Sequence, residues 1–279
     1  MNIHSILVVA QLTLAEARRR RIVTAALLCA LAVLAVFTTG VFFAASPRSR
    51  PATFIERQIM FTVLTMAGLY ASNFLSVLFA VLLPVDSLSG EIDSGVMQTL
   101  AVKPVHRSEI VIGKWLGNAL LIVGYMLVLM MGVLVSVRII GGFLPVNLTR
   151  AFPLMVLEVM LLATISIAGG TRFSTVTNGI LGLGYYGIAF IGGWMEQIGA
   201  LTRVEAVRKI GVVASLISPA DSMWRLAAYE LQPPLVRSVS LPFWNSFGGS
   251  PSALMVWWAA ASVVVILLYG VRTFAKRDL

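Results

Sequence analysis

Six long apolar runs dominate the sequence and set its fold class. They cover about residues 22–45, 59–85, 116–137, 153–170, 177–195 and 253–271. A helix needs about 20 residues to cross the hydrocarbon layer of a membrane, and each run has roughly that length or slightly less. The fourth and fifth runs are the shortest, and they are rich in glycine. The pattern predicts an all-α membrane protein with six transmembrane helices in one domain over residues 1–279.

The composition supports a membrane protein. Hydrophobic residues make up 58% of the chain and charged residues 12%, whereas a soluble domain has about 25% charged residues. The net charge of +9 does not indicate a nucleic-acid partner, because the basic residues lie beside the apolar runs and are not interleaved with aromatic residues. The lipid bilayer is therefore the expected surrounding.

The distribution of Lys and Arg predicts the orientation, because these residues accumulate in cytoplasmic segments. If the chain starts in the cytoplasm, the inner segments hold eleven of them and the short outer loops hold five. The inner ones are Arg18, Arg19, Arg20, Arg21, Lys103, Arg107, Lys114, Arg172, Arg272, Lys276 and Arg277. Both termini are then expected on the cytoplasmic side.

The first residues predict a helix of their own. Over residues 2–20 the apolar side chains recur with helical period, and polar side chains lie off that face. The apolar face consists of Ile3, Ile6, Leu7, Ala10, Leu14 and Ala17. Such a pattern is typical of an interfacial helix that lies on the membrane surface.

One polar segment between two apolar runs has the signals of ordered structure. In residues 86–115, Asp86 or Ser87 can cap a short helix, and Gly95 can end it. Pro104 forces a break at Lys103, and Ser108 can then cap a second helix. Two short helices around a proline, next to a membrane, predict a docking platform.

This segment also resembles a known family. The residues concerned are Ser89, Gly90, Glu91, Gly95, Leu100, Pro104, Arg107, Glu109, Ile110, Gly113 and Lys114. Their spacing is similar to that of the cytoplasmic segment of type-2 ABC exporter permeases, which include nitrous-oxide-reductase-cluster permeases and drug and polysaccharide exporters. Val96 departs from the family, which often has Thr after the glycine.

The resemblance implies a permease that works with a separate ATPase. It implies two ATPase copies, a second permease chain that is identical or related, export as the direction, and the bacterial inner membrane as the location. The residues that the resemblance assigns to ATPase coupling are Glu91, Ile92, Asp93, Gly95, Lys103, Pro104, Arg107 and Glu109. Ile92, Val96 and Leu100 would form the apolar face of this contact. An acid–base cluster of Glu91, Asp93 and Glu109 is the less favoured interpretation.

Motifs for chemistry within the chain itself are missing. The sequence has no GxxxxGKS/T phosphate loop, no HExxH and no GxSxG. It has two histidines and one cysteine, too few for a metal site with several His ligands or for an intrachain disulfide. We therefore expect no enzyme activity and no cofactor in this chain, with ATP and Mg²⁺ bound by the partner ATPase.

Residues 196–252 predict two short helices outside the cytoplasm. One is expected from a capping box at Thr202 and Glu205, and the other from Pro219 until Gln232 and Pro233 stop it. Both are too polar to span. They are expected to lie at or dip into the outer leaflet, as helices before the last span do in the resembling permeases; an ordinary loop is the alternative.

Three polar residues inside the predicted spans are candidates for a translocation path. Glu158 is an acid in an apolar run, which is costly and usually functional, yet its position near the outer end also suits an interfacial anchor. Asn73 and Asn118 are more typical of helix–helix hydrogen bonds than of substrate ligands.

Other functions remain as alternatives at this stage. A membrane enzyme needs converging catalytic groups, a non-transporting anchor needs only a partner complex, and a channel needs a ring of pore charges. The catalytic groups and the charge ring are not visible, and an anchor would differ in lacking substrate-stimulated ATP hydrolysis, so an ABC permease is the main prediction with the anchor as the alternative. The apolar spans weakly favour a lipid, a hydrophobic peptide or a drug-like substrate.

Overall fold

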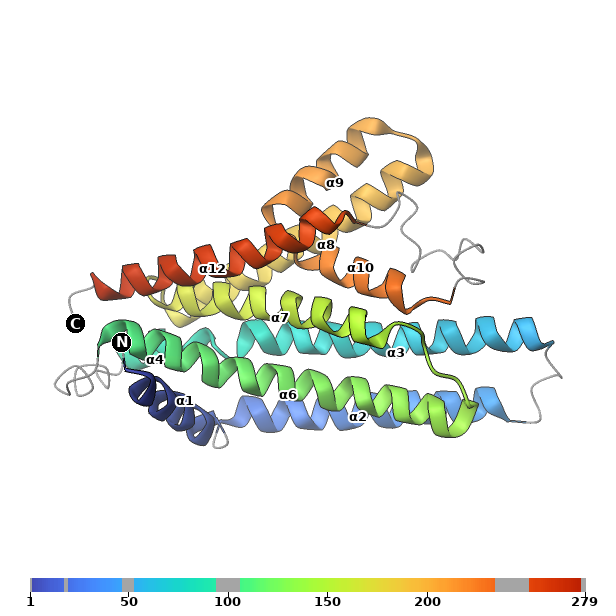
Figure 1. Cartoon of the computed structure of the whole chain (residues 1–279), viewed down its shortest axis with the longest axis horizontal. Coiled ribbons are helices and arrows are strands. Elements are labelled where there is room, and N and C mark those ends of the chain that lie inside the picture. The colour runs from blue at the N-terminus through green and yellow to red at the C-terminus, as the bar shows by residue number, and fades with distance from the viewer. Residues whose placement is uncertain (1, 18–19, 47–52, 94–105, 234–250, 277–279) are drawn as a thin grey trace.

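The computed structural model describes residues 2–17, 20–46, 53–93, 106–233 and 251–276, and every regular element in them is a helix (Figure 1). The helices are α1 (Ile3–Ala17), α2 (Arg21–Ala45), α3 (Phe54–Leu82), α4 (Val85–Asp93), α6 (Arg107–Gly141), α7 (Leu148–Gly170), α8 (Thr175–Thr202), α9 (Glu205–Ile217), α10 (Ala220–Leu231) and α12 (Ala253–Ala275). The all-α prediction is confirmed for this part of the chain.

Five helical stretches of the described chain are long and apolar enough to cross a membrane. They are α2, the stretch Ile55–Ile92 of α3 and α4, α6, α7 and α12. They match five of the six predicted spans. The other predicted span, 177–195, lies within α8, which is not among the five because glycine and polar residues interrupt its apolar sequence.

The long helices run side by side along the length of the molecule (Figure 1). The start of α1 and the end of α12 lie at one end of this bundle, and we call it the terminal end. The distal end holds the start of α3 and the end of α6. The main core fills the space between α3, α6, α7 and α10, with Leu69, Met126 and Met155 fully buried.

Helix α1 packs against α6 at two glycines. A Cβ atom at Gly113 would lie 2.6 Å from the Cβ of Val9 and 2.9 Å from the carbonyl oxygen of Ile6. At Gly117 it would lie 2.8 Å from the Cβ of Thr13. The spacing Gly113-x-x-x-Gly117 therefore allows a close helix crossing, and its partner is the N-terminal helix of the same chain.

Helix α10 is buried inside the bundle. It packs on α7 and α8, and its apolar residues Met223, Trp224, Ala227 and Leu231 are buried. In Figure 1 it lies alongside α3 and α7, within the length of the candidate spans. Residues 220–231 thus form part of the core, which the polar character of their sequence did not indicate.

Several predicted helix starts are wrong by one to three residues. Helix α4 begins at Val85, just after Pro84, so Asp86 and Ser87 lie within it. The N-cap of helix α6 is His106 and not Ser108, because the Glu109 carboxylate accepts a hydrogen bond from the His106 backbone N–H.

The predicted capping box at Thr202 is also wrong. Helix α8 continues to Thr202, whose hydroxyl donates to the Ile198 carbonyl, and the chain turns at Arg203 with a φ of 58°. Helix α9 then starts at Glu205, and α10 starts one residue after Pro219. The capping and proline patterns in the sequence predicted where these helices lie, whereas side-chain contacts decide the residues at which they begin and end.

Candidate functional site

Helix α4 is bound to α6 through a buried lysine. The Lys114 side chain is almost fully buried, and its ammonium donates to the Ser87 carbonyl oxygen at 2.7 Å and to the Glu91 carboxylate. The Asn118 amide donates to the Ser87 hydroxyl at 3.2 Å. A charge-assisted bond in a buried position is strong, so α4 and α6 are held together as a unit.

The other side of α4 is bound to α7 and α8. The hydroxyls of Ser89 and Thr175 are 2.8 Å apart and share a hydrogen bond. The Asn178 amide donates to the Val85 carbonyl at 3.3 Å and to the Ser166 carbonyl at 2.7 Å. Together with the lysine contacts, these bonds form what we call the α4 junction, which joins α4 to α6, α7 and α8.

The ends of α1, α6 and α12 also meet at the terminal end. The Asn2 backbone N–H donates to the Glu109 carboxylate at 2.5 Å, and Glu109 is 1% exposed. The Arg107 guanidinium donates to the Ala275 carbonyl oxygen at 3.3 Å. Arg20 pairs with Glu16 at 2.5 Å and reaches Asp86 at 3.6 Å, so α1, α4 and the start of α2 are joined as well.

The structure therefore shows where part of the predicted coupling set lies. Glu91 and Glu109 both bind groups of their own chain, and Ile92 packs against a small core of Leu88, Ile110, Val111, Ile167 and Phe274. The Asp93 side chain, Gly95, Val96, Leu100, Lys103 and Pro104 lie outside the described residues. Lys114 was part of the family motif and of the topology count but not of the predicted coupling set, although a lone basic residue between Ile112 and Trp115 could have indicated a buried ion pair.

A second polar cluster lies in the bundle core, and we call it the central cluster. Glu158 on α7 is fully buried, and its carboxylate accepts a hydrogen bond from the Asn73 amide on α3 at 3.0 Å. Two of the three predicted path residues thus meet. Asn118 does not join them, because it belongs to the α4 junction.

The central cluster continues with an arginine that was not predicted. The Arg225 guanidinium on α10 lies 2.9 Å from the Glu196 carboxylate on α8 and 3.0 Å from the Asp221 carboxylate on α10. It also donates to the hydroxyls of Ser215 and Ser222, each at 3.2 Å. These bonds join α8, α9 and α10.

Glycine makes this contact possible. A Cβ atom at Gly193 would lie 1.9 Å from an oxygen of the Asp221 carboxylate. Any side chain there would displace the carboxylate that binds Arg225. The i, i+4 spacing of Asp221 and Arg225 within one predicted helix is the sequence signal that could have found this pair.

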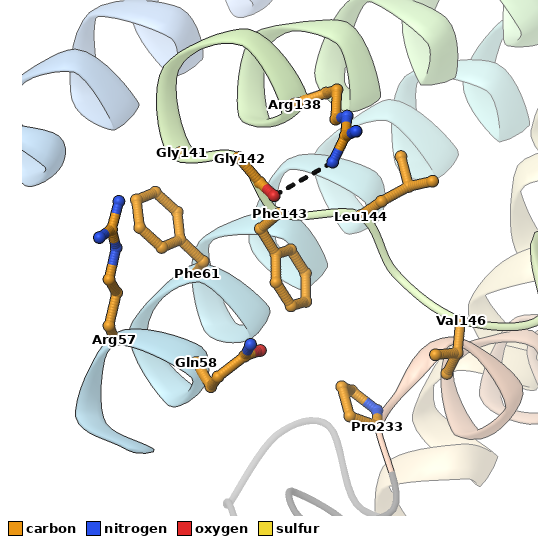
Figure 2. Close-up of a pocket in the computed structure, with 10 residues that line it drawn as sticks. All are labelled: Arg57, Gln58, Phe61, Arg138, Gly141, Gly142, Phe143, Leu144, Val146 and Pro233. Atoms are coloured by element: carbon orange, nitrogen blue, oxygen red, sulfur yellow. Dashed lines mark hydrogen bonds between the residues drawn. The ribbon is translucent and has the colours of Figure 1, made fainter. Parts of the chain in front are cut away.

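A cavity of about 660 Å³ opens at the distal end (Figure 2). Two arginines contribute to its wall: Arg57, whose guanidinium lies 5.7 Å from the centre of the Phe61 ring, and Arg138, which donates to the Gly142 carbonyl at 3.2 Å. The rest of the lining is mostly apolar and includes Phe143, Leu144 and Val146. Such a wall could receive an anionic group attached to an apolar body.

Within the described ranges, no group of three or more His, Cys, Asp or Glu side chains is placed to hold a metal ion.

Comparison with known families assigns the chain. The model of the family described as "ABC-2 family transporter protein" matches residues 15–181, which is more than half of the sequence. The chain belongs to this family. No curated protein matches it. The ABC-2 transporter match extends from the end of α1 to the first part of α8, so it includes the α4 junction, Asn73 and Glu158. The protein is a multi-pass membrane component of an ABC transporter.

Proposed function

We propose that this ABC-2 transporter chain is the permease subunit of an ATP-driven exporter and couples to a separate ATPase. The family match carries the proposal, because ABC-2 membrane proteins work as the transport component and not as the catalytic one. The proposed location is the bacterial inner membrane, with both termini in the cytoplasm. A lipid, a hydrophobic peptide or a drug-like molecule is the proposed substrate class.

The α4 junction supports a route for coupling. We place the ATPase at the terminal end, on the segment 86–115. A push on α4 would reach α6 through Lys114, α8 through Thr175 and α7 through Asn178. Arg107 would contact the ATPase, and Glu91 would transmit the movement through its bond to Lys114.

The outer faces of α2 and α12 support a second permease chain. Only 6% of the apolar window of α2 and 11% of that of α12 are buried within this chain, against 61% for α7. Lipid or another chain must therefore cover them. The proposal is a pair of permease chains with two ATPase copies, in which α8 serves as the sixth span.

Purification of the tagged chain with its ATPase, followed by assays of ATP hydrolysis and transport, tests this function. We expect Arg107→Glu to weaken co-purification of the ATPase, because the charge at the proposed contact is reversed. Arg203→Glu is the matched control, since Arg203 lies in the exposed turn between α8 and α9, away from the terminal end. Normal assembly and transport in Arg107→Glu would contradict the proposed contact.

The exchange Glu91→Lys with Lys114→Glu separates contact from transmission. It keeps an internal ion pair but reverses the charge on α4. Loss of ATPase binding would assign Glu91 to the contact, and intact binding without transport would assign it to transmission. Binding and hydrolysis in the wild-type complex without any transport would favour the alternative of a membrane anchor.

A further inference from the structure

The central cluster contains two oxygen atoms that lack a hydrogen-bond donor. Glu158 is 0% exposed and Asn73 is 2% exposed. The Asn73 amide nitrogen donates to Oε2 of Glu158, but Oε1 of Glu158 and Oδ1 of Asn73 have no partner in the described part of the protein. Both atoms are acceptors when Glu158 is ionised. Only an added donor or cation can therefore satisfy them.

The charges around Glu158 do not supply a cation. The ionisable groups that interact with it are the Asp221 carboxyl on α10 and the phenols of Tyr70 on α3 and Tyr186 on α8. The nearby guanidinium, that of Arg225, is already bound by Asp221 and Glu196. Three carboxyl groups thus share one positive charge.

The other helices packed on α7 do not add a free positive charge near Glu158. On α4 and α6, Lys114 and Glu91 are bound to each other, and Arg138 of α6 lies in the wall of the distal cavity. On α12, Tyr269 receives a hydrogen bond from Arg172, near the terminal end. A buried carboxylate without a cation is strongly unfavourable, and such a group takes up a proton instead.

We propose that Glu158 and Asn73 form a proton-binding site in the bundle core. A proton from water binds Oε1 of Glu158, and the new O–H donates to Oδ1 of Asn73. The Asn73 amide donates to Oε2 in return, so the acid and the amide form a reciprocal pair. One proton satisfies both oxygens and leaves the cluster with Arg225 balanced against fewer negative charges.

The site also sets a condition for proton exchange. Water must reach Oε1 for the proton to leave, and the pair is enclosed by α3, α7 and α10. Release therefore requires these helices to separate. An exporter cycle that opens this region would make transport depend on pH through Glu158, whereas the proton site itself exists with or without transport.

Infrared spectroscopy of the purified full-length chain at neutral pH tests the site. We expect a carbonyl stretching band of a protonated carboxyl group that exchanges slowly in D₂O and is lost in Glu158→Gln. In Asn73→Leu the band should shift to higher frequency, because its O–H loses the amide acceptor. Glu230→Gln is the control, since Glu230 lies at the other end of α10 and binds Asn147 at 3.3 Å.

Two further readouts keep the test decisive. Gln has the shape of the neutral acid and can form the same reciprocal pair, so Glu158→Gln should retain the thermal stability that Glu158→Ala loses. Identical carboxyl bands in wild type and Glu158→Gln would overturn the proposal. So would failure of Glu158→Gln to fold, or a melting temperature that rises with Na⁺ in wild type but not in Glu158→Gln, because a metal ion would then occupy the site.

Discussion

The α4 junction and the central cluster both bury charged side chains between helices, but they differ in how charge is balanced. At the α4 junction one ammonium binds one carboxylate and a carbonyl oxygen. In the central cluster one guanidinium serves two carboxylates, and a third carboxyl binds only an amide. A balanced pair can act as a rigid joint, whereas an excess of acids must bind a proton or another cation. The same residue types thus support different roles.

The largest effect is expected from Arg225→Met, which removes the cation of the central cluster. The side chain is 7% exposed, and its loss leaves Asp221 and Glu196 without a positive partner. Breaking a buried ion pair in this way costs about 3–5 kcal/mol. Unfolding in mixed detergent micelles measures the change. The triple variant with Asp221→Asn and Glu196→Gln should recover much of the loss, and the absence of recovery would contradict charge imbalance as the cause.

A smaller loss is expected from Lys114→Met at the α4 junction. Only Glu91 loses its cation there, so the cost should lie near the lower end of the same range, about 3 kcal/mol. The same unfolding measurement applies, and the double variant with Glu91→Gln is the control. If Lys114→Met proves more harmful than Arg225→Met, the comparison of the two clusters is wrong.

Gly113→Leu should have a more moderate effect, limited to the contact of α1 with α6. The new side chain would overlap Val9 and the Ile6 carbonyl, and such overpacking costs about 1–3 kcal/mol. A disulfide cross-link engineered between α1 and α6 should then form more slowly. Gly124→Leu, on the same helix with no atom within 4 Å of its added Cβ, should leave the rate unchanged. Equal cross-linking rates in wild type, Gly113→Leu and Gly124→Leu would mean that the position of α1 does not depend on its contact with Gly113.

The smallest effect is expected from Lys209→Met in α9. Its ion pair with Glu205 has a distance of 3.6 Å, and both side chains are 80% exposed. Exposed pairs contribute little because water and salt screen them. The free energy of unfolding should therefore be unchanged in Lys209→Met. A clear loss of stability would show that exposed ion pairs are not weaker than the pairs in the two buried clusters.

How far the sequence leads differs between regions of this ABC-2 transporter. Apolar runs predicted all five long apolar helices, because a run of about 20 apolar residues has few alternatives to a helix in lipid. The predicted sixth span lies in α8, whose glycines weaken the hydropathy signal but permit the close contacts at Gly192 and Gly193. The coupling motif did not indicate the bond between Glu91 and Lys114, because these residues lie 23 positions apart in the sequence.

The sequence by itself determined the helices and the family, because periodicity, composition and motif spacing are local properties. Only the tertiary structure decided that α10 is buried, that Asn73 meets Glu158 85 positions later, and that Arg225 binds Glu196. Those contacts depend on which faces of different helices meet, and a polar helix such as α10 enters a core only when its partners supply the matching charges. The physical reason is that burial of charge is favourable in pairs and costly alone, and pairs form in three dimensions.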